Sequence, residues 1–258
     1  MSRTATQQSA AEIFEQRGAR AALLASRNET SRDPLEFAAD LSRVQAACCE
    51  RLRQAALTGR LADDLDLLLP LLDPMLRVIA TRSEQAEEHL DDDPQTRRTR
   101  LHVYWAGDAN DYDFRALLQP YASVLRSRTI TPDRVHKRGH CPFCGGAAWI
   151  GARRQQPEAE SGFRFLQCSL CALEWNISRI HCPSCFEEDP YKLPQFQSDA
   201  HPNVRIEACE TCRRYVKSID LTQDARPIPA VDDLLSLSMD LWAAEEGFSR
   251  IEPGIAGI

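Results

Sequence analysis

The chain has 258 residues, of which 43% are hydrophobic and 27% are charged, and its formal net charge is −7. These proportions are typical of a globular protein, and the length allows one large domain or two smaller ones. The sequence contains no apolar run near the roughly 18 residues that a membrane helix needs. The opening MSRTATQQSAAEIFEQRGAR lacks the apolar core and cleavage site of a secretory signal. We therefore expect a cytoplasmic protein without membrane insertion.

Residues 1–133 are predicted to form a helical domain. The stretch DPLEFAADLSRVQAACCERLRQAAL opens with Asp33 as a cap and Pro34 in the first turn. Apolar residues then recur at spacings of three and four, which is typical of one buried helix face. Cys48 lies on this face and is expected in the core, with Cys49 as its incidental neighbour. The face is formed by Leu41, Val44, Cys48, Leu52 and Ala55.

Two further helices are expected before residue 133. DPMLRVIATRSEQAEEHL repeats the Asp-Pro opening at Asp73, and DYDFRALLQPYASVLRSR predicts a helix that is bent or broken near Pro120. The intervening HLDDDPQTRRTR is so highly charged that we expect a solvated loop.

A repeat dominates residues 134–222. HCPFCGG begins at His140 and HCPSCFE at His181, while RFLQCSLC and RIEACETC begin at Arg164 and Arg205, so both pairs are offset by 41 residues. A constant offset of this kind indicates one structural unit used twice. We place the two units at about 138–178 and 179–219.

Eight of the ten cysteines fall in four Cys-x-x-Cys pairs. Disulfides are typical of small secreted proteins, and a lone Cys-x-x-Cys is also a redox motif. Four pairs with an equal 23-residue gap repeated instead indicate four-thiolate metal sites. If the unit is a duplicated module, each copy must have bound its own ion with its own two Cys-x-x-Cys pairs. Sequential pairing of the four Cys-x-x-Cys pairs is therefore favoured over a cross-brace, in which the first pairs with the third and the second with the fourth. The predicted metal ligands are Cys141, Cys144, Cys168 and Cys171 for one ion, and Cys182, Cys185, Cys209 and Cys212 for the other.

Each unit should consist of short antiparallel hairpins that carry the cysteine turns. RRQQPEAESG in the first unit is expected to be an exposed loop, with FEEDPYKLPQFQSDAHP in the matching place of the second. His140 and His181 are expected to lie beside the sites without ligating. Arg164 and Arg205 recur at matched positions, where they either serve strand pairing or partly offset the charge of the thiolates.

The last part, residues 223–258, is predicted as an extended segment followed by a helix. Asp232 or Asp233 should cap LLSLSMDLWAAEE, and Gly247 should end it. We expect this helix to pack back on the helical region through a stripe of Leu234, Leu237, Leu241 and Ala244. The fold class is therefore α+β: an N-terminal helical domain, two tandem rubredoxin-like or zinc-ribbon-like modules and a C-terminal helix.

Other functional motifs are scarce. The sequence contains no Walker loop, dinucleotide-binding glycine pattern or nucleophile elbow, so no catalytic residues are assigned and no enzyme is expected. Residues 134–217 carry 12 Lys or Arg against 9 Asp or Glu, an excess that the thiolates of two metal sites would cancel. Without a concentrated basic surface, nucleic-acid binding is not expected.

The segments RGHCPFCGG, RFLQCSLCALEWNISRIHCPSC, CETCRRYVK and VDDLLSLSMDLWAAEEGF resemble the FdhE family over residues 110–248. This resemblance implies an accessory protein for formate dehydrogenase formation that binds the catalytic subunit of the enzyme before export. It also implies rubredoxin-like iron sites at the eight paired cysteines. Phe186 departs from the pattern, because it stands where the first unit has Gly145, so iron is better supported in the first site.

Two alternatives remain open from the residues. One is a rubredoxin-like electron-transfer module, because four-thiolate iron can change oxidation state. The other is a zinc-stabilised protein-binding or nucleic-acid-binding domain that is unrelated to formate.

Overall fold

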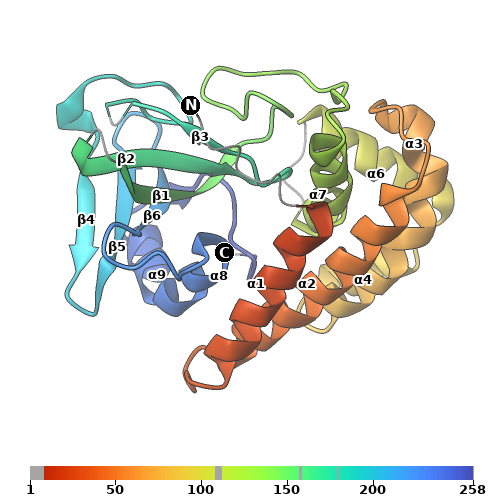
Figure 1. Ribbon diagram of the computed structural model, residues 1–258, viewed down its shortest axis with the longest axis horizontal. Helices are drawn as coiled ribbons and strands as arrows, with labels where there is room; N and C mark the ends of the chain where they lie inside the picture. The colour runs from red at the N-terminus through yellow and green to blue at the C-terminus, as the bar shows by residue number, and fades with distance from the viewer. Residues whose placement is uncertain (1–8, 108–111, 157–158, 179, 258) are drawn as a thin grey trace.

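A computed structural model describes residues 9–107, 112–156, 159–178 and 180–257. Helices of the N-terminal half lie side by side next to a twisted sheet built from the second half (Figure 1). No helix within these ranges is long and apolar enough to cross a membrane. The N-terminal elements are α1 (Ala10–Ala25), α2 (Arg32–Arg53), α3 (Leu61–Leu68), η1 (Leu69–Leu71), α4 (Leu72–Ala80), α5 (Glu84–Leu90), α6 (Pro94–Ala106) and α7 (Tyr112–Ser127).

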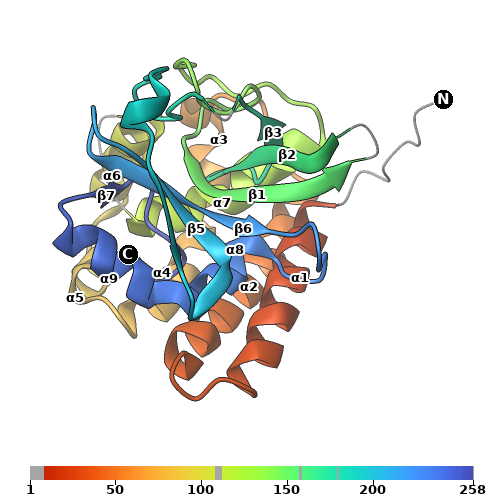
Figure 2. The ribbon, with the colours of Figure 1, turned by 90° about the vertical axis from the view of Figure 1, so that its left-hand side faces the viewer.

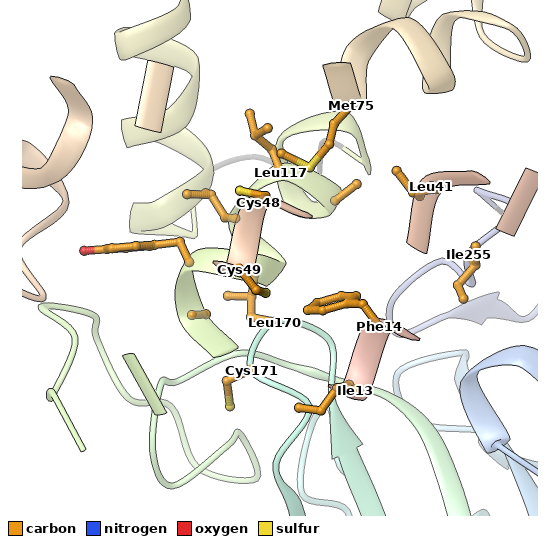
Figure 3. Close-up of a cluster of buried hydrophobic side chains, with 14 of the residues drawn as sticks. Ile13, Phe14, Leu41, Cys48, Cys49, Met75, Leu117, Leu170, Cys171 and Ile255 are labelled. Carbon is orange, nitrogen blue, oxygen red and sulfur yellow. The ribbon is translucent and has the colours of Figure 1, made fainter. Parts of the chain in front are cut away.

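The predicted helix at 33–57 is present as α2, and its apolar face is buried as expected. The helix begins earlier than predicted, with Ser31 at the N-cap, so Asp33 lies in the first turn instead of capping it. Cys48 is buried in the helical core, and Cys49 is buried with it. Figure 3 shows both thiols among the apolar side chains of this core. Cys49 is therefore a core residue and not an incidental neighbour.

The charged tract at 89–100 is not the loop that we predicted. Most of it belongs to α6, where Pro94 occupies the first turn and Asp93 is the N-cap. The Asp93 carboxylate accepts hydrogen bonds from the backbone N–H groups of Gln95 at 2.8 Å and Thr96 at 3.1 Å. The neighbouring stretch at 73–90 is split into α4 and α5, and Asp73 lies in the first turn of α4 without capping it.

Helix α7 continues through Pro120, where a bend or a break was predicted, and it is not broken there. Proline has no N–H to donate to the carbonyl four residues earlier, which here belongs to Ala116. The Gln45 side chain of α2 replaces that donor, with its Nε2 2.7 Å from the Ala116 oxygen. A buried amide from a neighbouring helix thus satisfies the carbonyl that the proline leaves open.

The strands of the described residues form one sheet in the order β3-β2-β1-β6-β5-β4, with β7 paired to β6 (Figure 2). At the 41-residue offset, β4, β5 and β6 overlap the positions of β1, β2 and β3. The two repeated units therefore lie edge to edge, joined by parallel pairing of β1 with β6. The strands are β1 (Ala148–Gln156), β2 (Ala159–Cys168), β3 (Glu174–Asn176), β4 (Gln195–Ser198), β5 (His201–Cys209), β6 (Arg214–Asp220) and β7 (Ser249–Arg250), with η2 (Pro190–Lys192) before β4.

The two loops predicted within the units are largely regular structure. Most of RRQQPEAESG belongs to strands β1 and β2, and residues 157–158 lie outside the described ranges. The segment 186–202 contains η2, β4 and the start of β5. A polar composition does not exclude strands, because an antiparallel sheet can have one solvated face.

The C-terminal segment forms α8 (Pro229–Asp232), η3 (Asp233–Ser236) and α9 (Leu237–Glu245). Helix α8 packs on α1, and Leu234 of η3 belongs to the main hydrophobic cluster, against which Leu237 at the start of α9 also packs. Helix α9 packs on the sheet through Met239 and Ala243, which share a cluster with Ile206 and Tyr215. Leu241 and Ala244 are exposed, so the apolar stripe predicted for this helix was wrong at two of its four positions.

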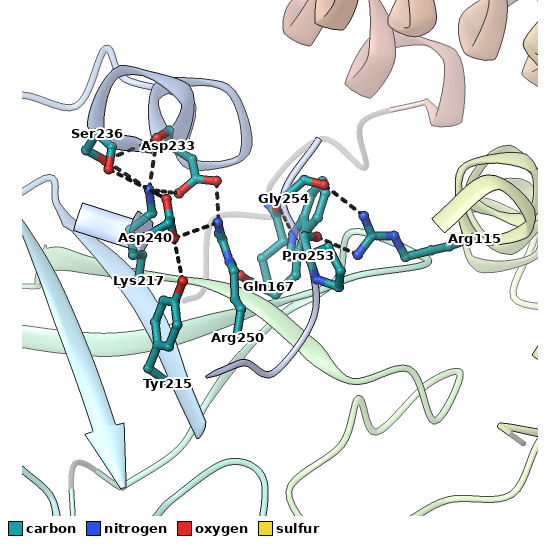
Figure 4. A network of polar contacts seen from close by, with 11 residues as sticks. Arg115, Gln167, Tyr215, Lys217, Asp233, Ser236, Asp240, Arg250, Pro253 and Gly254 are labelled. Carbon is teal, nitrogen blue, oxygen red and sulfur yellow. Dashed lines mark hydrogen bonds and ion pairs between the residues drawn. The ribbon is translucent and has the colours of Figure 1, made fainter. Parts of the chain in front are cut away.

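Asp232 and Asp233 form buried ion pairs and do not cap the helix. Asp232 pairs with Arg20 of α1, at 2.9 Å between Oδ2 and Nε. Asp233 pairs with Lys217 at 2.8 Å and with Arg250 at 2.9 Å. Figure 4 shows this second cluster, which Asp240 completes between α9, β6 and β7. These pairs fasten the C-terminal segment to both α1 and the sheet.

Candidate metal centres

The first four-cysteine group lies between the turn before β1 and the end of β2. Cys141 and Cys144 come from that turn, Cys168 ends β2, and Cys171 follows one turn later. The Sγ atoms of Cys141 and Cys171 are 3.6 Å apart, and those of Cys144 and Cys168 are 3.4 Å apart. The hairpin brings together two pairs that are separated by 23 residues in the sequence.

The second group repeats this arrangement in the second unit. The Sγ atoms of Cys182 and Cys212 are 3.7 Å apart, and those of Cys185 and Cys209 are 3.6 Å apart. The cysteines are grouped sequentially and not in a cross-brace, as the repeat predicted.

Both groups have the dimensions of a four-thiolate metal site. Within each group, all four Sγ atoms lie within 4.8 Å of one another. A tetrahedral ion with metal–sulfur bonds of about 2.3 Å places its ligands about 3.8 Å apart. Each group could therefore hold one metal ion with small adjustments of the side chains.

All four cysteine turns share one backbone feature despite their different sequences. The residue after the second cysteine of each pair has a positive φ, which normally favours glycine because a Cβ atom costs about 1–2 kcal/mol there. Only the first turn uses glycine, so the substitution at Phe186 did not change the turn. The φ angles are 67° at Gly145, 56° at Ala172, 65° at Phe186 and 55° at Arg213.

The two groups differ sharply in burial. The four cysteines of the first group are at most 1% exposed and belong to the main hydrophobic cluster of the protein. Figure 3 shows Cys171 and Leu170 directly next to the core side chains of α1 and α2. In the second group Cys185 is exposed and Cys212 is partly exposed. Solvent therefore reaches the second group but not the first.

The thiols of the first group are electrostatically coupled. Hydrogen bonds from the thiols of Cys144, Cys168 and Cys171 hold the pKa of Cys141 far below its ordinary value. Burial, together with the neighbouring sulfur atoms, raises the pKa of Cys168 well above its ordinary value. Four thiolates can coexist in this buried space only if a cation compensates them, which is what a bound metal ion supplies.

A buried polar chain connects the first group to the helices. Gln45 Nε2 donates to Gln119 Oε1 at 2.8 Å, and Gln119 Nε2 donates to the Ser169 carbonyl at 2.7 Å. Ser169 lies inside the second cysteine turn, between Cys168 and Cys171. The helix pair α2 and α7 therefore fixes the backbone of this turn.

The histidines beside the cysteines are not members of either group. His140 Nδ1 lies 3.0 Å from the Gly145 carbonyl, and the His181 ring packs on Phe186 at 4.8 Å between ring centroids. The recurring Arg164 is buried and forms an ion pair with Glu207 of the second unit at 2.5 Å. Its charge is thus used to join the two units.

Two buried charged features near the sheet were not predicted from the sequence. One is Arg17 of α1, which is 4% exposed, stacks on the Trp149 ring at 5.3 Å and lies within the electrostatic reach of Cys168. The other is the cluster of Lys217, Asp233 and Arg250 described above. A lysine within the apolar alternation of YVKSID was the available signal for the second feature, whereas Arg17 resembles any polar helix position.

Comparisons with known proteins give one family for the cysteine-bearing half and a matching fold for nearly the whole chain. The family models "FdhE, central domain" and "FdhE, C-terminal domain" match residues 140–179 and 180–255. The crystal structure of the FdhE protein from Pseudomonas aeruginosa covers 97% of both chains with a TM-score of 0.71 and 26% identity. The chain is thus similar to the FdhE family: its cysteine-bearing half matches both domain models, and its fold matches the FdhE crystal structure.

Curated FdhE relatives match mainly the cysteine-bearing half. An FdhE homologue of Aquifex aeolicus is 34% identical over 140 residues, which cover 54% of this chain and 49% of the relative. An FdhE homologue of Pseudomonas putida is 36% identical over 119 residues, covering 45% of this chain and 37% of the relative. The chain thus spans about half or less of the length of these relatives.

Proposed function

We propose that this protein is a cytoplasmic accessory factor of the FdhE kind for the assembly of a formate dehydrogenase, and that it binds the catalytic subunit of that enzyme before export. The similarity to FdhE proteins supports the proposal, because the resemblance in the cysteine segments implies assembly and not catalysis. The two four-cysteine groups are the observation that carries it, since they are the features that the resemblance ties to this role. Formate is then oxidised by the partner and not by this chain.

We also propose that all eight paired cysteines are metal ligands. Iron is the preferred ion, with zinc as the alternative, and the first site is the stronger candidate for iron. The spacing of the Sγ atoms in each group suits either ion. A bound ion would fix the cysteine turns, and the second group would present part of its site at the surface, where a partner protein can reach it.

Electron transfer is a second candidate function, and the exposure of Cys185 favours it. Electron exchange requires a redox centre close to the surface, and only the second group has that property. Purified protein with iron in this site should be coloured and should bleach on reduction. Two zinc ions and a colourless protein would remove this candidate.

The assembly role can be tested by retention of the catalytic subunit on the tagged full chain in formate-grown cells. We expect the subunit to be retained by the wild-type protein and by Cys48→Ser, and to be lost when Cys182 and Cys185 are both replaced by serine. Cells that lack the protein should make the catalytic polypeptide but show little formate oxidation. Full formate dehydrogenase activity in such cells, with no subunit retained, would contradict the proposal.

A further inference from the structure

A cleft lies between the helical region and the sheet, beside the first cysteine group. Its cavity volume is about 650 Å³, and α1, α7, the first unit and the segment before α8 all contribute to its lining. Each of these four parts supplies one arginine: Arg17, Arg126, Arg154 and Arg226. Ligand sites of small molecules commonly have volumes of about 300–1,000 Å³, so the cleft has the size of a binding site.

Two of these arginines already have carboxylate partners. Arg154 binds Glu174 with two hydrogen bonds of 3.1 and 2.8 Å. Arg226 binds Asp224 in the same two-bond manner at 2.9 and 2.8 Å. Their charges are compensated within the protein, so they are not the groups that demand an external anion.

Arg17 and Arg126 have no carboxylate partner among the described residues. Arg17 has a weak contact with Gln167 Oε1 at 3.5 Å and stacks between the rings of Phe14 and Trp149. The buried Nε of Arg126 has no hydrogen-bond partner within the described ranges. Burial and, next, the charge of Arg126 lower the pKa of Arg17 to about 10. Two mutually repelling guanidinium groups therefore face one cleft without an anion of the protein to compensate them.

Helix α7 compensates only part of the charge of Arg126. The C-terminal end of α7 offers Arg126 about half a negative charge from the helix dipole. The remaining positive charge is directed into the cleft.

We propose that this arginine cleft binds a small organic molecule through a phosphate or pyrophosphate group held by Arg17 and Arg126. Planar guanidinium groups bind phosphate oxygens in pairs, and two of them match the charge of a dianion. The cleft is larger than a phosphate group needs, and Ile13, Ala172 and Ile228 give the remainder an apolar lining for the organic part. This inference does not depend on the proposed role in formate dehydrogenase assembly.

Pyrophosphate binding to the metal-loaded full chain tests the proposal. Isothermal titration calorimetry should show one site, with pyrophosphate binding more tightly than sulfate or chloride at equal ionic strength. Arg126→Gln should weaken this binding about tenfold or more, because one charge-assisted partner is lost. Arg43→Gln is the matched control, since Arg43 is exposed on α2, is paired with Asp40 and does not line the cleft. It should leave the affinity unchanged.

Ala225→Glu provides a second variant that leaves the core untouched, because Ala225 is exposed on the rim of the cleft. The added carboxylate should also weaken pyrophosphate binding, while metal content and circular dichroism stay as in the wild type. The proposal is overturned if pyrophosphate binds no more tightly than sulfate, or if neither variant weakens it. It is likewise overturned if Arg126→Gln shifts only the metal absorbance, which would make these arginines charge partners of the cysteine site alone.

Discussion

The two cysteine groups share one backbone design but have very different surroundings. The first is enclosed by α1, α2 and α7 and is part of the main hydrophobic core. The second lies at the far part of the sheet, with Cys185 exposed. The repeat alone therefore does not decide how stable or accessible a site is. The elements that pack against each unit determine the stability and accessibility of its site. They make the first site part of the core and leave the second site accessible to a partner protein.

Removing ligands should affect the two sites unequally, and this is the largest effect we expect. Cys141→Ser with Cys144→Ser should prevent stable folding of the whole chain, because a four-cysteine site contributes about 10–16 kcal/mol and total stabilities are only about 5–15 kcal/mol. Cys185→Ser with Cys212→Ser should remove one ion but leave the helices folded. Thermal unfolding followed by circular dichroism compares the two. Equal losses of stability in both variants would show that the burial difference has no energetic consequence.

The buried ion cluster should stabilise the chain independently of both sites. Lys217→Met removes one of the two buried cations that Asp233 and Asp240 share and leaves Arg250 to compensate both carboxylates, which should cost about 3–5 kcal/mol. Denaturant unfolding measures this loss, and metal analysis should still find both ions. Lys192→Met is the control, because Lys192 is exposed and its ion pair with Glu187 should contribute only about 0–1 kcal/mol. A loss of metal in Lys217→Met would show that the cluster supports the cysteine turns directly.

The smallest expected effect concerns the strained turn residues. Ala172→Gly should raise the free energy of unfolding by about 1 kcal/mol, because Ala172 has a φ of 56°. The melting temperature should rise by about 2–4 °C in a protein of this size. Ala47→Gly should have the opposite sign, since Ala47 is exposed within α2 and glycine costs about 1 kcal/mol there.

In the second site, replacing the positive-φ residue by glycine should raise the free energy of unfolding by a smaller amount. Phe186→Gly relieves a similar φ of 65° but also removes the contacts of the ring with His181 and Arg138. If Phe186→Gly raises the free energy of unfolding more than Ala172→Gly does, the ring contacts contribute nothing to stability.

The sequence predicted the features that depend on local spacing. The 41-residue offset correctly predicted the grouping of the cysteines, and three-four periodicity correctly placed Cys48 in a core. Helix α6 was missed although Asp93-Pro94 carries the same signal as Asp33-Pro34, because its buried residues come only near its end, at Leu101, Tyr104 and Trp105.

Long-range packing could not be predicted in this way. The parallel pairing of β1 with β6 joins residues that are 67 positions apart in the chain, such as Ile150 and Lys217, and no local pattern encodes it. The same is true of the burial difference between the sites, which arises from helices distant in the sequence. Asp233 was assigned to capping because its partners, Lys217 and Arg250, are likewise remote.

Metal release from the wild-type chain tests the central claim, that two metal sites differ through their burial. Metal analysis should find two ions per chain, and a chelator should remove one of them well before the other. Iodoacetamide added at that point should modify Cys182, Cys185, Cys209 and Cys212 and leave the first group protected. Cys48 is the internal control, since burial raises its pKa to about 12 and keeps it a protonated, unreactive thiol. Release of both ions at one rate, or modification of Cys141 before Cys185, would contradict the account.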